Sequence, residues 1–139
     1  MNVERVKTFF AMLSGIPDER LVWSDWREGP TDTFYVVTDE NLLGHSDSRA
    51  HPVGWACAYP EFRKQGLHFY RGCPKYLDKI GWRAVAVFFD FAPSDIRCVF
   101  GQDYEIETKS GILKGILYAL YRERAIDRAR YDLFKGELK

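Results

Sequence analysis

The strongest structural signal in the chain is the segment from residue 82 to residue 105, WRAVAVFFDFAPSDIRCVFGQDYE. Residues 84–91 are aliphatic or aromatic at nearly every position, which is typical of a strand covered on both faces. Residues 93–95, Pro-Ser-Asp, have the chemistry of a turn, and residues 96–100 return to β-branched and aromatic side chains. The segment therefore predicts a central antiparallel β-hairpin. The residues that we expect to be buried in it are Val85, Val87 and Phe89.

The two ends of the chain have the pattern of helices. Asn2 can cap a first helix whose apolar residues continue at helical spacing to Leu13, and Gly15 ends it. Ser110 is expected to cap a last helix that extends to about Phe134, with its apolar stripe in the early turns.

Between the first helix and the hairpin, local composition predicts short strands. A strand is expected at residues 33–38, which are rich in β-branched and aromatic side chains. Residues 21–26 are expected to form a short strand or a turn, and residues 53–59 a third strand. Residues 39–52 are polar and predict a loop, and residues 75–80 are expected to form one helical turn. The prediction is an α+β fold, a small antiparallel sheet with N-terminal and C-terminal helices packed on it.

Length and composition limit the possible architecture and cellular location of the protein. A chain of 139 residues is expected to form a single domain, residues 1–139, with its own core. Three cysteines without paired spacing, no N-terminal signal and no apolar run of about 20 residues predict a cytoplasmic protein with reduced thiols and no membrane partner.

Charge is balanced overall but is unevenly distributed along the sequence. The formal net charge is zero, which argues against binding to nucleic acid through global positive charge. Residues 18–47 are rich in Asp and Glu, whereas residues 122–139 carry more Arg and Lys than acids. Either these two regions bind partners of opposite charge, or they pack against each other.

The residues most suited by their chemistry to catalysis or metal binding lie between positions 45 and 73. The loop of residues 45–51 holds two His, two Ser and one Asp, but a catalytic triad normally draws its members from separate elements. The spacings lack the close ligand pairs of a zinc site, so we expect no metal, no cofactor and no covalent chemistry. The candidates considered for metal binding or nucleophilic catalysis are His45, His51, Cys57, His68 and Cys73.

Residues 59–67, YPEFRKQGL, resemble the acyl-CoA loop of GNAT-type acetyltransferases. In that family a loop after a strand turns its backbone amides toward a pyrophosphate at the start of a helix. Arg63 and Gly66 match the family's pattern, whereas His68 stands where a second small residue is expected. Pro74 would shorten the helix that follows. The resemblance implies an acyltransferase, which we keep, together with a hydrolase, as the alternative function.

The preferred hypothesis is a small inhibitor of the immunity-protein or phage anti-defence type, which occludes a basic site on a protein partner. Its anchors would be two tryptophans flanked by carboxylates, because aromatic anchors supply affinity and charges supply steering. The alternative for the tryptophans is burial in the core. The expected contact residues are Trp23, Asp25, Trp26, Glu28 and Asp32, and a second candidate surface consists of Arg122, Arg124, Arg128 and Arg130.

Overall fold

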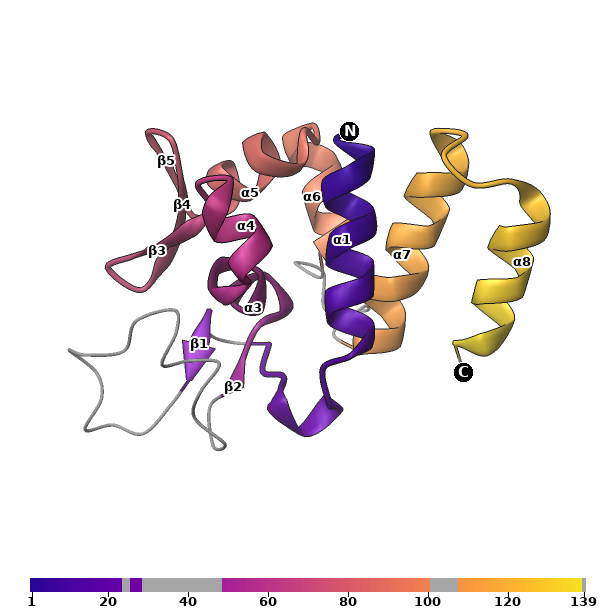
Figure 1. The fold of residues 1–139 in the computed structure, drawn as a ribbon, viewed down its shortest axis with the longest axis horizontal. Helices are drawn as coiled ribbons and strands as arrows, with labels where there is room; N and C mark the ends of the chain where they lie inside the picture. The colour runs from indigo at the N-terminus through magenta and orange to yellow at the C-terminus, as the bar shows by residue number, and fades with distance from the viewer. Residues whose placement is uncertain (24–25, 29–48, 101–107, 139) are drawn as a thin grey trace. The chain divides into compact units, whose positions relative to one another are not determined.

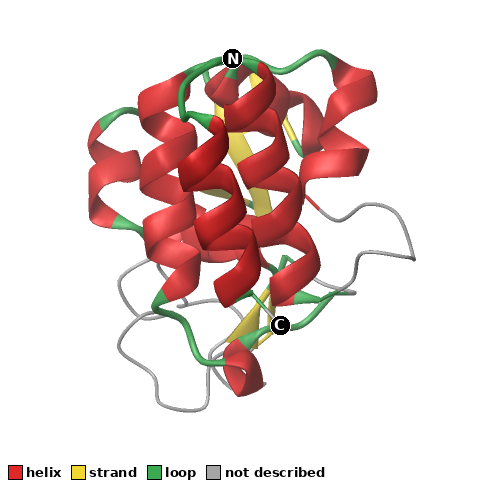
Figure 2. Cartoon of the chain, turned by 90° about the vertical axis from the view of Figure 1, so that its right-hand side faces the viewer, coloured by secondary structure: helices red, strands yellow, loops and turns green. Residues whose placement is uncertain are grey.

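The computed structural model describes residues 1–23, 26–28, 49–100 and 108–138 (Figure 1). The helices are α1 (Val3–Ser14), the short 3₁₀ helix η1 (Asp18–Arg20), α3 (Pro52–Ala58), α4 (Pro60–Lys64), α5 (Trp82–Phe89), α6 (Pro93–Phe100), α7 (Lys109–Arg122) and α8 (Arg128–Glu137). The strands are β1 (Arg27–Glu28), β2 (Arg49–Ala50), β3 (His68–Tyr70), β4 (Cys73–Tyr76) and β5 (Lys79–Ile80). Helices predominate beside a small antiparallel sheet, which confirms the α+β class (Figure 2).

The described chain divides into two compact units, and the expectation of a single domain remains a prediction. The first unit combines Met1–Gly15 with Phe89–Lys139, and the second is Ile16–Phe88. The boundary at Phe89 coincides with the last residue of α5. None of the helices in the described part of the chain has both the length and the apolar character needed to cross a bilayer.

Helix α1 confirms the prediction for the N-terminal end. The Asn2 side chain accepts a hydrogen bond from the backbone amide of Arg5 at 3.1 Å, and Gly15 follows the last helical residue. The side chain of Phe9 is fully buried, with its ring centroid 5.5 Å from Phe89 and 5.0 Å from Phe100. These edge-to-face contacts form the aromatic centre of the first unit.

The predicted last helix is wrong as one continuous element, because it is two helices, α7 and α8. Thr108, not Ser110, caps α7 by accepting a hydrogen bond from the amide of Gly111 at 2.9 Å. Arg124 adopts φ 59° after α7, where its amide bonds to the Tyr121 carbonyl at 2.9 Å. The next amide, of Ala125, bonds to the Leu120 carbonyl at 2.9 Å. This Schellman arrangement ends α7, with arginine in the place that glycine usually takes.

The early turns of α7 are buried as expected, while α8 has no fully buried residue. Helix α7 packs on α1, α6 and α8 within the first unit. The carboxylate of Asp127 caps α8 by accepting from the Arg130 amide at 2.8 Å. The buried stripe of α7 consists of Ile112, Leu113, Ile116, Leu117 and Leu120.

The predicted central hairpin is wrong, because its two arms are the helices α5 and α6. The buried positions of α5 recur at helical spacing, and Val87, which was expected to be buried, is 44% exposed. The expected burial of Val85 and Phe89 is confirmed, since both are fully buried. The proline of the predicted turn, Pro93, instead begins α6, a position that its fixed φ favours. Residues 101–105 lie outside the described residues.

The strand predicted at residues 53–59 is also wrong, since α3 occupies this segment. Pro52 is at the first helical position, and His51 caps the helix. All seven residues of α3 are buried, so neither a polar face nor a helical periodicity marks the segment in sequence. Helix α3 packs on β3 and β4 within the second unit.

The helical turn predicted at residues 75–80 is wrong, because these residues belong to strands β4 and β5. The three-stranded sheet has the order β3-β4-β5 and is antiparallel throughout. Pro74 is tolerated in the central strand because it lies beyond the residues that β5 pairs with. Its carbonyl accepts a hydrogen bond from the Gly81 amide at 2.8 Å, which needs no N–H from proline.

The remaining strand predictions are tested only in part. In the segment predicted at residues 21–26, Leu21 forms an isolated bridge with Ala50, and the paired strand β1 begins one residue later, at Arg27. The strand predicted at residues 33–38 lies outside the described residues.

Candidate functional site

The candidate site is built around His51, at the start of α3. Its Nδ1 accepts a hydrogen bond from the backbone amide of Val53 at 3.1 Å. The residue is 3% exposed. Because Nδ1 is the acceptor, a neutral ring carries its proton on Nε2.

Three tryptophan rings surround this histidine. The ring centroids of Trp23 and Trp26 each lie 5.7 Å from that of His51, and the centroid of Trp82 lies 5.6 Å away. All three contacts are edge-to-face, and Trp26 also packs on Trp82 at 4.8 Å. We call these four residues the tryptophan cluster. The three indoles are partly buried and partly exposed, so the cluster reaches the surface of the second unit.

Burial determines the charge of the cluster. Desolvation lowers the pKa of His51 to about 4, because an imidazolium ion would lose its hydration among the indole rings. At neutral pH the ring is therefore uncharged, and its low basicity makes it a poor general base. The arrangement fits a rigid, apolar aromatic surface rather than a centre of proton transfer.

Backbone contacts hold the cluster in place. Strand β1, directly after Trp26, pairs with β2, directly before His51. A Cβ atom on Gly54 would overlap the backbone carbonyl of Trp26, so only glycine permits this close approach.

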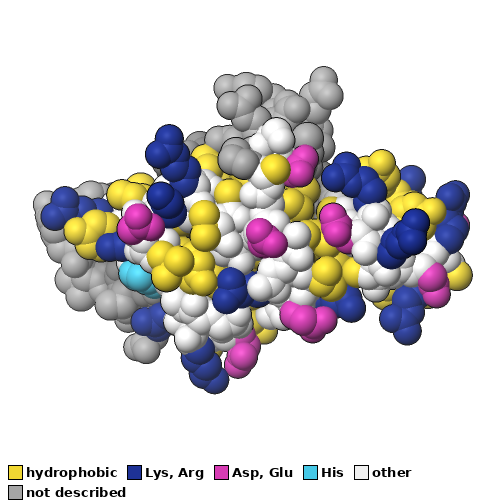
Figure 3. Space-filling view, turned by 90° about the horizontal axis from the view of Figure 1, so that it is seen from above, with side chains coloured by type: hydrophobic (Ala, Val, Ile, Leu, Met, Phe, Trp, Pro, Cys, Tyr) yellow, Lys and Arg dark blue, Asp and Glu magenta, His cyan; other side chains and the backbone are white. Residues whose placement is uncertain are grey.

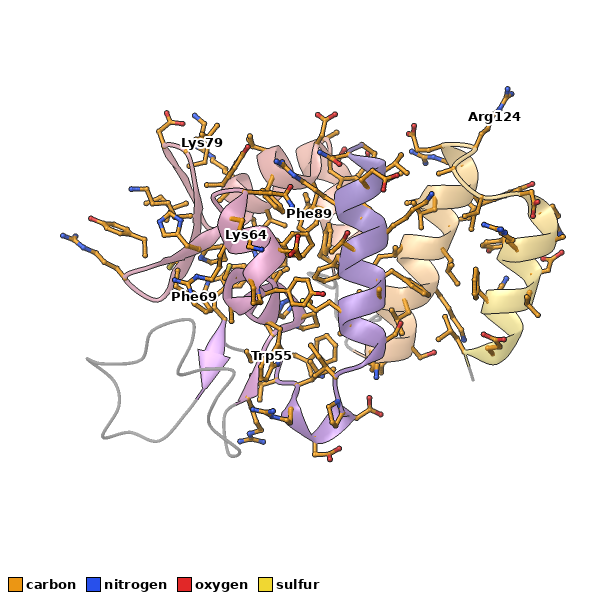
Figure 4. All side chains as sticks on the ribbon, viewed as in Figure 1. Trp55, Lys64, Phe69, Lys79, Phe89 and Arg124 are labelled. Atoms are coloured by element: carbon orange, nitrogen blue, oxygen red, sulfur yellow. The ribbon has the colours of Figure 1, made fainter. Side chains whose placement is uncertain are left out.

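The chain that precedes the cluster is held against α3. The indole Nε1 of Trp55, labelled in Figure 4, donates a hydrogen bond to the Arg20 carbonyl at 2.9 Å. The guanidinium carbon of Arg20 lies 4.6 Å from the centroid of the same ring. The backbone amide of Val22 bonds to the Ala50 carbonyl at 3.1 Å. Together these contacts fix the path of the chain just before Trp23.

The structure brings together two of the five predicted contact residues. Trp23 and Trp26 meet at His51, and each is partly buried and partly exposed, so their role as contact residues stays a prediction. Glu28 is in β1, where its backbone pairs with Arg49. Asp25 and Asp32 lie outside the described residues.

The second candidate surface lies at the end of α7 and in α8. Its four arginines are exposed, and Arg124, labelled in Figure 4, projects from the connection between these helices. Arg128 is bound within its own helix, since its Nε lies 3.0 Å from Oδ2 of Asp132. This arginine therefore forms an ion pair with the residue one helical turn later in α8.

The candidate ligands and nucleophiles of residues 45–73 lie in different environments. His51 is enclosed by indoles and Cys57 is buried in α3, while His68 and Cys73 are on β3 and β4. Within the ranges that the structure describes, no three His, Cys, Asp or Glu side chains are grouped so that they could hold a metal ion. His45 lies outside these ranges, and the side chain of Cys98, on α6, is not described.

The order of elements differs from that implied by the acetyltransferase resemblance. The family's loop follows a strand and begins a helix, whereas here the helices α3 and α4 precede Gly66 and strand β3 follows it. Arg63 belongs to α4, and Gly66 has φ 102°, a turn conformation suited to glycine. The local geometry expected for a pyrophosphate-binding loop is therefore not the one observed.

Sequence reasoning missed His51 and Trp82 as members of the cluster. The sequence places His51 in a polar loop and Trp82 at the start of the predicted hairpin. The His-Pro pair at residues 51–52 was the available signal, because proline favours the first turn of a helix. Comparison with protein-family models, with curated proteins and with solved structures finds no match to this chain.

Proposed function

We propose that this protein is a small cytoplasmic inhibitor that binds a protein partner and occludes the partner's functional site. The observation that carries the proposal is the tryptophan cluster, in which three partly exposed indoles pack around one neutral histidine. Tryptophan is the residue type most enriched among the energetic anchors of protein interfaces.

The packing of the cluster supports a role as an anchor. Each indole contacts the His51 ring, and Trp26 contacts Trp82, so the rings are held before any partner arrives. Binding then costs less side-chain conformational entropy than it would with mobile side chains. A rigid apolar surface of this kind favours insertion into a complementary pocket.

The sequence around the cluster supports a partner with a basic site. Asp25, Glu28 and Asp32 follow Trp23 closely in sequence, and carboxylates beside an apolar anchor would steer a positively charged partner. The arginines of α7 and α8 remain a second candidate surface. One of them, Arg128, is already engaged by Asp132, which makes that surface the weaker candidate.

The enzyme alternative, an acyltransferase or hydrolase that uses residues 45–73, has less support. The lowered pKa of His51 disfavours its use as a base at neutral pH. Cys57 is fully buried in α3, which is typical of a packing residue rather than of a nucleophile. The inhibitor proposal requires neither a metal nor a cofactor.

The decisive experiment isolates the partner from host extract by cross-linking and affinity purification, and then measures its affinity by titration calorimetry. Trp23→Ala should weaken binding by about 2 kcal/mol or more, roughly thirtyfold. Tyr118→Ala is the control, because Tyr118 is a 54% exposed aromatic residue on α7. Circular dichroism checks that both variants are folded. If they then bind the partner with equal affinity, the cluster is not the anchor.

A further inference from the structure

The register of the β3–β5 sheet separates two faces. Phe69 pairs with Pro74, which is buried, and the Tyr76 ring packs edge-to-face on Phe88 at 5.1 Å, so this face turns toward the core of its unit. The alternate residues form the opposite face, because side chains alternate along a strand and directly paired residues share a face. We call this opposite face the outer face, and its residues are His68, Tyr70, Cys73, Lys75 and Ile80.

The outer face combines exposed apolar groups with positive charge. Tyr70 is 40% exposed and Ile80 is 52% exposed. The Lys75 Nζ lies 4.3 Å from the centroid of the Tyr70 ring, and the guanidinium carbon of Arg71 lies 5.2 Å from it. On the left of Figure 3, the side on which Figure 1 draws this sheet, Lys and Arg side chains lie beside hydrophobic ones.

The sequence around the sheet is strongly basic although the whole chain is neutral. Residues 61–83 contain six Lys or Arg and two acids, Glu61 and Asp78, which lie 3.4 Å from Lys64 and 3.7 Å from Lys79. The positive charge is therefore local to this part of the second unit, and it is complementary to a partner with negative charge. The six basic residues are Arg63, Lys64, Arg71, Lys75, Lys79 and Arg83.

In each turn of the sheet, a residue with a large side chain has a positive φ, a backbone conformation that such residues disfavour. Arg71 has φ 52° ahead of Gly72, where hairpins of this kind favour asparagine. Leu77 has φ 56° in the second turn and is 67% exposed. A leucine here gains little from burial and is strained by its backbone, so folding does not account for it. Strained residues of this kind cluster at sites of function.

We propose that the outer face and its two turns bind an acidic, amphipathic segment of a protein partner. Carboxylates of the segment pair with Arg71 and Lys75, and its apolar side chains pack on Leu77 and Ile80. A single-stranded nucleic acid fits less well, because base stacking needs a free aromatic face, and the Tyr70 ring is engaged by cations. This surface shares no residue with the tryptophan cluster and differs from it in charge, since a basic partner is proposed for the cluster.

The test pans a phage library of random short peptides on the immobilised full-length chain, and measures the enriched peptides by fluorescence anisotropy. Enriched sequences should combine Asp or Glu with Leu or Phe. Lys75→Glu should weaken their binding about tenfold, and Lys114→Glu, the same charge change at an exposed position of α7, should leave it within about twofold.

Leu77→Asn distinguishes a binding role from a folding role. Asparagine tolerates the left-handed conformation, so the variant should melt at or above the wild-type temperature while peptide binding falls about fivefold. Trp23→Ala should bind these peptides as the wild type does, which separates this surface from the proposed inhibitor site.

Three results would overturn the proposal. The first is enrichment of peptides without acidic residues. The second is unchanged peptide binding by both Lys75→Glu and Leu77→Asn. The third is binding of an oligothymidylate or of phosphatidylserine vesicles that is tighter than peptide binding and is lost in Lys75→Glu.

Discussion

At the scale of single residues, His51 links folding to pH. Its pKa is about 4 in the folded chain, against about 6.5 for an unperturbed histidine. Between these values the unfolded chain binds the proton more readily, so stability falls as pH falls from about 6.5 to about 4. Above this window the contribution of His51 is constant.

We expect the free energy of unfolding to fall by about 2 kcal/mol between about pH 8 and about pH 5 through His51 alone. Urea denaturation at the two pH values measures the change. His51→Asn keeps a side-chain acceptor for the Val53 amide but does not titrate, so its pH dependence should be smaller by this amount. The same pH dependence in both proteins would contradict the assignment of a buried, neutral His51.

Gly54 is the second residue for which we make a prediction, because only glycine fits at its position. Gly54→Ala would place a methyl group against the Trp26 carbonyl, and we expect a loss of about 3 kcal/mol or more, because backbone must move to relieve the overlap. The matched control is Gly136→Ala in α8, where an added Cβ meets nothing within 4 Å. This control should be neutral or more stable by up to about 1 kcal/mol. Thermal melting of the two variants checks the difference, and equal melting points would contradict the close approach.

At the scale of elements, α5 can be tested as a helix by two substitutions. Phe89→Ala should cost about 3 to 5 kcal/mol, because it empties a fully buried site beside Phe9 and Phe100. Val87→Ala should change stability by less than about 0.5 kcal/mol, because Val87 is exposed and alanine favours a helix. Chemical denaturation measures both variants. A large loss in Val87→Ala would support the strand that the sequence alone predicts.

At the scale of the whole molecule, the two compact units raise the question of cooperativity. We expect one calorimetric transition, as for a single domain, with an unfolding enthalpy of about 100 kcal/mol near 60 °C. Two resolved transitions, or a van't Hoff enthalpy far below the calorimetric one, would contradict the single-domain prediction.

The uneven charge of the chain gives a second prediction at this scale. Asp25→Lys combined with Glu28→Lys should weaken partner binding about tenfold at low salt and reduce its salt dependence, mainly through slower association. The melting temperature should hold, since substitutions of surface charges scarcely alter folding. The control, Glu123→Lys with Glu137→Lys, makes the same charge change at exposed positions after α7 and in α8. If the two double variants bind equally, the acidic region does not steer the partner.

The sequence by itself determined the features that depend on local chemistry. Asn2 and Gly15 delimit α1, as capping preferences predict, and the buried stripe of α7 follows the helical period. These elements have one face toward the core and one toward solvent, so their periodicity is visible in sequence. The α+β class is confirmed, but its three-stranded sheet lies at residues 68–80, where the sequence predicted no strand.

Only the tertiary structure decided the identity of α3 and α5 and the membership of the tryptophan cluster. Helix α3 is buried on all sides, and α5 on most, so a continuous apolar run describes a strand or a helix equally well. The cluster joins Trp23 and Trp26 to His51 and Trp82, which are far apart in the chain. Contacts of this range are determined by packing among complete elements, because no local preference specifies which rings will meet.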